Sequence, residues 1–274
     1  SITVEEGNPY FHAVNNCLIE TATGRLILGC KNSVIPDDGS VRTIGFGAFA
    51  NATNLTSVNI PASVQTIETS AFQSCSALTS ITIPDGVTTI SGGVFANCRS
   101  LSSINLPESI TSIEENAFGY CESLTSFTVP SGVTSIPKDA FSNCKSLADI
   151  KLHDKITTIG QKAFYYCSSL KQITIPASVT RIYERAFSSC TSLESVVIPD
   201  GITTLYEGTF QLCSSLSGIT IPESVTSIGN SSFKGCSSLT NITIPENVTT
   251  IREGAFENCT NLTKYIFNAT NCTS

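Results

Sequence analysis

The side chains in this sequence that could do covalent or metal chemistry are twelve cysteines and two histidines. Nine of the cysteines recur at intervals of 23 residues. A zinc site calls for Cys-x-x-Cys spacing or converging ligands, and neither is present. The column therefore predicts small buried thiols, each donating weakly to a nearby backbone carbonyl. Its members are Cys75, Cys98, Cys121, Cys144, Cys167, Cys190, Cys213, Cys236 and Cys259.

Disulfide formation is the alternative chemistry for these thiols. Equivalent atoms of stacked repeats lie roughly 4.8 Å apart, which is within the Cα range of a bridge. Stacked side chains point in the same direction, however, and nine is an odd number, so the column is predicted to be reduced. Cys17 and Cys30 differ because they flank two predicted strands around the turn at residues 21–24. Whether these two form a bridge stays open.

The histidines do not indicate catalysis. His12 is predicted to lie at the surface of an irregular N-terminal unit, and His153 stands where other repeats have proline. His153 next to Asp154 could be an acid–base pair, but no nucleophile or metal companion accompanies it. We therefore predict no catalytic residue, no metal site, no cofactor and no enzymatic activity.

Polar side chains around the His153 repeat are the candidate binding residues. Asp149 and Lys151 alternate with apolar Ile150 and Leu152, so both are expected on the exposed side of a strand, where other repeats carry Ser, Thr or Asn. They could contact a partner, or they could be exposed positions whose opposite charges favour solubility. The candidate partner-binding set is Thr128, Asp149, Lys151, Gln172, Thr174 and Val197.

Five tyrosines form a second group, expected away from this strand. They could provide another contact surface, or they could lean over the gaps between neighbouring repeats. The group consists of Tyr120, Tyr165, Tyr166, Tyr183 and Tyr206.

These residues must be positioned by a repeat. Phenylalanine recurs every 23 residues from Phe49 to Phe256, and leucine comes six positions later. A fixed period in the twenties indicates a solenoid, in which each repeat is one coil stacked on the next. Phenylalanine at every coil is too large for any place but the core, so a stacked aromatic spine is predicted.

Each coil is expected to contain three kinds of segment. An Ile-x-Ile pair predicts a short strand ending at proline, and ten such strands from residues 58–60 to 265–267 should form a parallel sheet. Residues 2–4 and 34–35 are predicted to extend that sheet. A Val-Thr-x-Ile segment predicts an extended stretch opposite. Phe, Cys and Leu at spacings of three then predict a short helical turn.

Composition limits the partners. The net charge is −7 and Lys and Arg do not cluster, which argues against a nucleic-acid partner. No apolar run approaches 18 residues, so no membrane insertion by this segment is expected. Methionine is absent and the chain opens in the strand phase of the repeat, so we expect a segment of a longer precursor. Nine Asn-x-Ser/Thr sequences would matter only in a eukaryotic secretory host.

The unit LxxIxIPxxVTxIxxxAFxxCxx, seen at residues 101–123 and in seven close copies, resembles the BspA-like leucine-rich repeat. The resemblance implies an α/β solenoid: a right-handed arc with its parallel sheet on the concave face and short helical turns and extended segments opposite. Residues 1–33 would be an irregular N-terminal repeat, 34–267 the solenoid and 268–274 a tail, all in one continuous domain. The family carries no catalytic motif.

The resemblance also implies an extracellular protein on the surface of host-associated bacteria or protozoa. The expected function is non-enzymatic binding of a host or neighbouring-cell protein along the concave sheet by a monomeric adhesin segment. One alternative is a spacer or stalk that presents another domain. Another is glycan binding, although the chain has no tryptophan.

Overall fold

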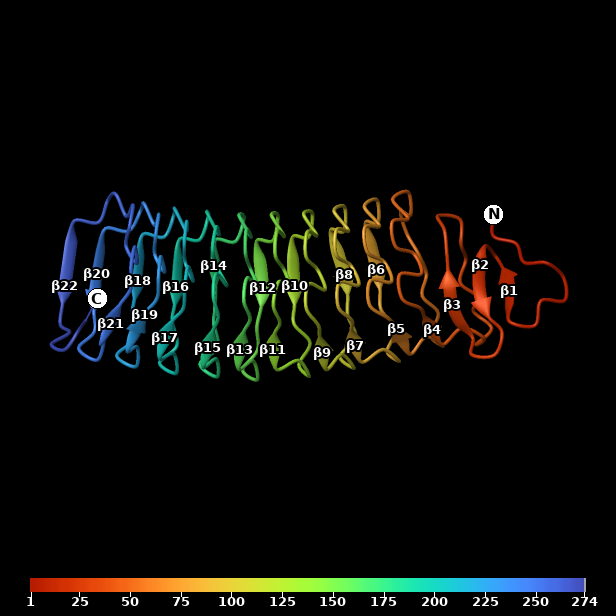
Figure 1. Ribbon diagram of the computed structural model, residues 1–274, viewed down its shortest axis with the longest axis horizontal. Helices are drawn as coiled ribbons and strands as arrows, with labels where there is room; N and C mark the ends of the chain where they lie inside the picture. Colours follow the sequence, from red (N-terminus) through yellow and green to blue (C-terminus); the bar gives the residue numbers. More distant parts are fainter. Residues whose placement is uncertain (274) are drawn as a thin grey trace. The chain divides into compact units, whose positions relative to one another are not determined.

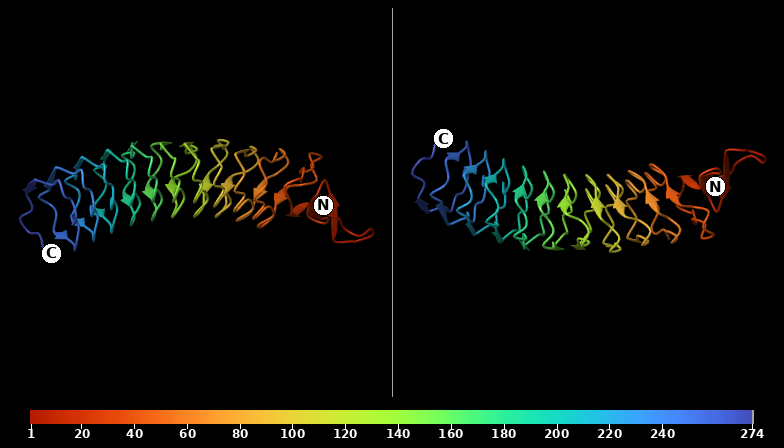
Figure 2. Two further views of the ribbon diagram at one scale, coloured as in Figure 1. Left: turned by 90° about the horizontal axis from the view of Figure 1, so that it is seen from above. Right: turned by 90° about the horizontal axis from the view of Figure 1, so that it is seen from below.

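The structure is a computed structural model that describes residues 1–273. Contacts divide the chain into two compact units. Unit 1 contains residues 1–124 and 130–133, and unit 2 contains residues 125–129 and 134 onward. Each unit is a β-solenoid of stacked coils, whose strands lie beside one another in Figures 1 and 2. This confirms the predicted solenoid.

Unit 1 begins with antiparallel strands and continues with parallel ones. Strands β1, β2 and β3 pair antiparallel, and β3, β4 and β5 then pair parallel within the same five-stranded sheet. The strands are β1 (Phe11–Val14), β2 (Cys17–Glu20), β3 (Arg25–Leu28), β4 (Thr43–Ile44), β5 (Thr66–Ile67), β6 (Ser80–Thr82), β7 (Thr89–Ile90), β8 (Ser103–Asn105) and β9 (Ser112–Ile113).

Unit 2 contains thirteen strands, and every strand pairing within its described residues is parallel. The strands are β10 (Ser126–Thr128), β11 (Ser135–Ile136), β12 (Asp149–Lys151), β13 (Thr158–Ile159), β14 (Gln172–Ile173), β15 (Arg181–Ile182), β16 (Ser195–Val197), β17 (Thr204–Leu205), β18 (Gly218–Thr220), β19 (Ser227–Ile228), β20 (Asn241–Ile244), β21 (Thr250–Ile251) and β22 (Lys264–Phe267).

The strands form two ladders because each coil has two short alternating segments. In most strands of the first ladder a buried Ile, Val or Phe lies between two outward-facing side chains, as in the exposed–buried–exposed pattern of β12, whereas all four residues of β22 are exposed. In the second ladder the Val-Thr-x-Ile segment gives two-residue strands such as β13, which pairs with β15. Paired residues in these ladders are 23 apart, so each side chain lies beside its equivalent on the neighbouring coil.

The predicted phenylalanine spine is the core of both units. In unit 1, the rings of Phe49 and Phe72 stack with centroids 5.2 Å apart. In unit 2, Phe187 stacks on Phe164 at 5.3 Å and on Phe210 at 5.6 Å. Interplanar angles along the spine are small, at 10° and 5° for the two Phe187 pairs. All five rings are buried.

The prediction of short helical turns was wrong, because residues 1–273 contain no helix. Around Phe187, alternate backbone N–H groups bond along the coil and across to the next coil. The Ser188 N–H donates to the carbonyl of Arg185 at 3.1 Å, whereas the Ser189 N–H donates to that of Gln211 at 2.7 Å. Arg185 and Ser189 both have positive φ, at 55° and 64°. Left-handed residues on each side of the phenylalanine therefore prevent an α-helix from propagating.

Three predicted strands are also absent. Residues 2–4 and 34–35 form no strand, because the N–H of Ile2 bonds to the side chain of Asn16 and that of Val34 to the carbonyl of Asn15. Residues 58–60, next along that ladder, consequently have no paired strand on their N-terminal side and are irregular as well. The N-terminal strands instead join the second ladder, through β3, β4 and β5.

Residues 1–273 hold no helix that is long and apolar enough to cross a lipid bilayer. They also hold no group of three or more His, Cys, Asp or Glu side chains arranged to bind a metal ion.

Candidate functional site

The first ladder of unit 2 presents the predicted binding residues on its outer side. All six candidate side chains are exposed. Register places Lys151 of β12 directly beside Thr128 of β10, and Val197 of β16 beside Thr220 of β18. Gln172 and Thr174 lie on the coil between β12 and β16. The structure therefore brings the six residues onto four successive coils of one unit.

Two further charged residues directly precede strands of this ladder and were missed at the sequence level. Lys171 and Glu194 are one residue ahead of β14 and β16, and both side chains are exposed. The Glu194 N–H donates to the carbonyl of Lys171 at 2.9 Å, so the two are direct neighbours. The signal was available: both stand one position before the Asp149 column, where other coils carry Thr, Ala or Ser. We define the polar strand face as these two residues together with the six candidates.

The charges of the polar strand face are not used inside the molecule. Asp149, Lys151, Lys171 and Glu194 form no side-chain ion pair or hydrogen bond with any described residue. Elsewhere in unit 2 charged residues do pair between coils, as Arg185 does with Glu207 at 2.6 Å. Two acidic and two basic groups therefore remain available to a partner, and their formal charges sum to zero.

Val197 is the apolar residue within this surface. Its side chain is 76% exposed, the highest value among the large exposed hydrophobic residues. Its neighbours on the flanking coils are Thr174 and Thr220. A single exposed valine is common on protein surfaces, so Val197 gains significance only from its position among unpaired charges.

His153 serves the turn after β12. The Ile156 N–H donates to the carbonyl of His153 at 3.2 Å, which is the same bond that the Val179 N–H makes to Pro176 one coil later. The Lys155 N–H donates to Nδ1 of His153 at 3.3 Å. His153 therefore takes over the turn function of the proline that it replaces.

The cysteine column forms the predicted ladder of thiols. All twelve cysteines are free. In each unit a Cys Sγ donates to the carbonyl of a phenylalanine 26 residues earlier, for example from Cys75 to Phe49 and from Cys190 to Phe164, both at 3.1 Å. Burial raises the pKa of Cys75 and of Cys190 to about 12, which leaves both thiols protonated and unreactive near neutral pH. The column is part of the core.

Cys17 and Cys30 are unbridged, and both lie near Ser33. The Ser33 hydroxyl lies 3.7 Å from Cys30 Sγ, and Cys17 Sγ lies 3.6 Å from the carbonyl of Val34. Burial raises the pKa of Cys17, although a hydrogen bond with Ser33 opposes the change.

The tyrosines are only partly brought together. Tyr183 and Tyr206 stack with centroids 5.6 Å apart, and Tyr165 meets Tyr166 edge-on at 4.8 Å. Tyr120 belongs to unit 1, whereas the other four belong to unit 2. Tyr183 and Tyr206 come directly after strands of the second ladder, so they lie apart from the polar strand face.

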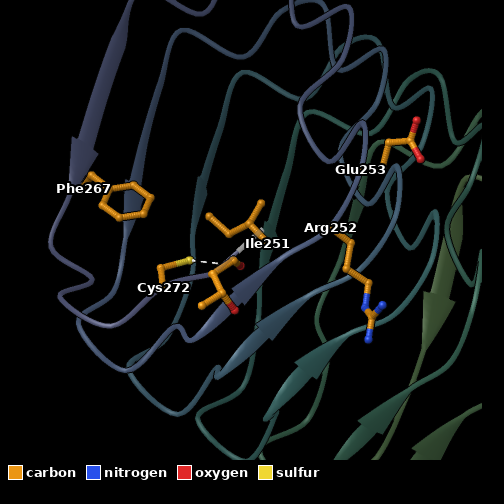
Figure 3. Close-up of a pocket in the computed structure, with 6 residues that line it drawn as sticks. Ile251, Arg252, Glu253, Phe267 and Cys272 are labelled. Carbon is orange, nitrogen blue, oxygen red and sulfur yellow. Dashed lines mark hydrogen bonds between the residues drawn. The ribbon is translucent and has the colours of Figure 1, made fainter.

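A cavity of about 530 Å³ lies against the last described coil and contains none of the predicted binding residues. It is lined by residues 251–253 and by Phe267, Cys272 and Thr273, and the Ile251 N–H donates to the carbonyl of Thr273 at 3.2 Å. In Figure 3 the side chain of Arg252 extends away from Phe267 and Cys272. We assign this cavity no chemistry.

Comparison with known proteins identifies the repeat. The profile of the BspA type leucine rich repeat region matches residues 42–171 and 157–274, in six copies. Among curated proteins, no match was found. A solved structure of a leucine rich cell surface protein from Faecalibacterium prausnitzii is 28% identical, covers 97% of each chain and has a TM-score of 0.58.

The pneumococcal vaccine antigen PcpA has a TM-score of 0.59 over 95% of this chain and 88% of its own, at 15% identity, which shows similarity of fold alone. A leucine-rich repeat protein from Bacteroides ovatus is 24% identical over 93% of this chain and 86% of its own, with a TM-score of 0.48. Because the family profile covers most of the coils described above, this chain belongs to the BspA type leucine-rich repeat family.

Proposed function

We propose that the chain binds a protein partner noncovalently through the polar strand face of unit 2. The observation that carries the proposal is the set of four charged side chains that pair with nothing else in the described chain, arranged around an exposed valine. Charged groups that a fold does not use can still steer and orient a partner. The balanced charge favours a protein surface of mixed polarity over a polyanion.

The strand face is also suited to binding because its backbone is already ordered. Parallel pairing to neighbouring coils holds the backbone of the strand residues of this face, as between Thr128 and Lys151 and between Gln172 and Ser195. Association costs less when the binding surface does not have to be ordered first. Many modest polar contacts can then add up along the ladder.

The setting that we propose is a cell surface, with a host or neighbouring-cell protein as the partner. The family match and the leucine rich cell surface protein from Faecalibacterium prausnitzii support this location. An adhesin that presents this surface outside the cell would use it without any covalent chemistry.

The test is selection of a phage-displayed random peptide library on the purified chain, followed by affinity measurement with the enriched peptides. The triple variant Asp149→Ala, Lys151→Ala, Gln172→Ala should weaken binding by about tenfold or more, which corresponds to about 1.4 kcal/mol. The matched control is the double variant Asn241→Ala, Thr243→Ala on β20, a strand of the same ladder that lies outside the polar strand face.

Unchanged affinity in the triple variant would refute the assignment of this surface. If no peptide is enriched at all, the spacer alternative is favoured instead.

A further inference from the structure

In unit 2, the column directly after the second-ladder strands is interrupted by glycine twice, at Gly160 after β13 and at Gly229 after β19. Four successive coils carry Tyr183, Tyr206, Gly229 and Arg252 at this position. The first two rings stack at 5.6 Å. The next coil has no side chain at this position, and the coil after it has a guanidinium. One face of the Tyr206 ring therefore borders a space one coil wide, with Arg252 roughly 10 Å away across two coil spacings.

The glycine in this gap is required by the backbone. A Cβ on Gly229 would lie 2.8 Å from the carbonyl oxygen of Leu205 and 2.8 Å from the carbonyl carbon of Tyr206. The Gly229 N–H donates to that Leu205 oxygen at 2.7 Å, which holds the two coils close together. The space beside Tyr206 is therefore built into the packing of the coils and does not depend on a side-chain rotamer.

The gap opens into a cleft of about 300 Å³, which we call the tyrosine slot. Tyr206, Gly229 and Arg252 line it, together with Glu184, Glu207 and Asn230 of the adjacent column. Glu207 is paired with Arg185 at 2.6 Å. The side chains of Glu184, Asn230 and Arg252 form no hydrogen bond or ion pair with any other described residue. Their donors and acceptors remain available to a ligand.

The chemistry of the walls limits the class of ligand. Because Glu207 is neutralised by Arg185, the unpaired wall charges are Glu184 and Arg252. An anion attracted by Arg252 would be repelled by Glu184, and a cation attracted by Glu184 would be repelled by Arg252. A fully apolar group would leave the carboxylate, amide and guanidinium without hydrogen bonds in a site that it had dehydrated. The fitting ligand is uncharged, has donors and acceptors around its edge, and has one apolar face for the Tyr206 ring.

We propose that the tyrosine slot binds a neutral pyranose residue. Sugar hydroxyls both donate and accept, so they match Glu184, Asn230 and Arg252 together, and the C–H face of the ring can lie on Tyr206. A cleft of about 300 Å³ is at the small end of ligand sites, which suits a single ring. This proposal is independent of the polar strand face, which lies on the other ladder.

The experiment is titration of the full chain, produced in bacteria so that the Asn230-Ser231-Ser232 sequence is unmodified, with galactose, glucose, mannose and N-acetylglucosamine. Amide shifts of Gly229 and Asn230 in ¹H–¹⁵N spectra report on the slot. At least one neutral sugar should move both signals, with a dissociation constant in the millimolar range. The methyl glycoside of that sugar is then compared with the free sugar. Equal affinity indicates that the natural ligand is a sugar residue within a glycan, and weaker binding of the glycoside indicates that it is the free sugar.

Variants then separate binding from folding. Tyr206→Ala and Asn230→Ala should each weaken binding by about fivefold or more, because each removes one contact. Tyr206→Phe keeps the ring and should bind nearly as well. Gln161→Ala changes the same column as Asn230 three coils earlier and should have no effect. The strand-face triple variant should also bind the sugar normally.

Several results would overturn the proposal. One is the absence of amide shifts with every neutral sugar. Another is tighter binding of glucuronate or choline than of any neutral sugar, which would show that one wall charge dominates. A third is unchanged affinity in both Tyr206→Ala and Asn230→Ala.

Discussion

Truncation of one spine residue gives a direct test of the core. Phe187 is fully buried and stacks on both neighbours, Phe164 and Phe210. Phe187→Ala should lower the free energy of unfolding by about 4 kcal/mol, since buried Phe→Ala changes cost about 3–5 kcal/mol. That is a large share of the roughly 5–15 kcal/mol that stabilises typical folded domains.

The matched control is the same change at the end of the spine. Phe256 is only half-buried, stacks on Phe233 at 5.3 Å and meets Tyr265 edge-on at 6.3 Å. Without a stacked ring on its other side and with less area to expose, Phe256→Ala should cost about half as much or less.

The assay is urea unfolding monitored by far-ultraviolet circular dichroism, with both variants compared to the unmodified chain. Repeat proteins can unfold in parts, so the slope of free energy against urea must be compared as well as the midpoint. Equal losses in the two variants, or a loss below about 1 kcal/mol for Phe187→Ala, would refute the stacked-spine account of stability.

Four further predictions concern thiols and glycines. Under denaturing conditions without reductant all twelve cysteines should react with a thiol reagent, and fewer than nine would contradict the reduced ladder. In the native chain at pH 8, Cys75 and Cys190 should stay unreactive, and fast labelling of either would contradict their burial. The folded-state pKa of both thiols is raised to about 12 from the ordinary 9.0, so their protonated forms stabilise the fold below pH 9. The free energy of unfolding should therefore fall as the pH rises from 9 to 12. Cys190→Ala should make that fall shallower. Gly235→Ala should destabilise by about 1–2 kcal/mol in thermal melts, since φ is +76° and the new Cβ would lie 2.8 Å from Leu212 Cδ2, whereas Gly218→Ala, with nothing within 4 Å, should be neutral or stabilising.

The parts of the fold that could be predicted are those that repeat. Phe187 and Cys190 belong to columns with a fixed period, so burial can be inferred from periodicity alone, and the structure places both in the core. The helical turn that the Phe, Cys and Leu spacing predicts could not be excluded from periodicity. Spacings of three fit one face of a helix and equally fit a chain that turns sharply at each third residue. The difference lies in left-handed residues such as Arg185 and Ser189, which have no consistent residue type along the column.

The candidate surfaces were predicted less completely because they depend on relations between coils. Asp149 and Lys151 are visible in one repeat as charges alternating with apolar residues. Lys171 and Glu194 stand in different repeats and become a pair of neighbours only once their column is aligned. The position of Tyr183 and Tyr206 in the repeat places both off the predicted sheet. It does not show which side chain lies beside Tyr206 on the next coil, so the sequence does not decide whether these rings pack between coils or contact a ligand.

The way in which this solenoid makes a cleft depends on the same columns. Most folds build clefts from loops, but here each coil repeats the last one and its side chains normally cover their neighbours. Omitting one side chain between two large ones leaves a space whose width is set by the coil spacing and whose walls are the adjacent members of the column. Gly229 between Tyr206 and Arg252 is such an omission, and the tight approach of its backbone to Leu205 keeps the position empty. Ligand specificity can therefore change by substitution in a surface column while the core columns of Phe, Cys and Leu stay constant. For this reason, the residues that identify the family are not those that we expect to select its ligands.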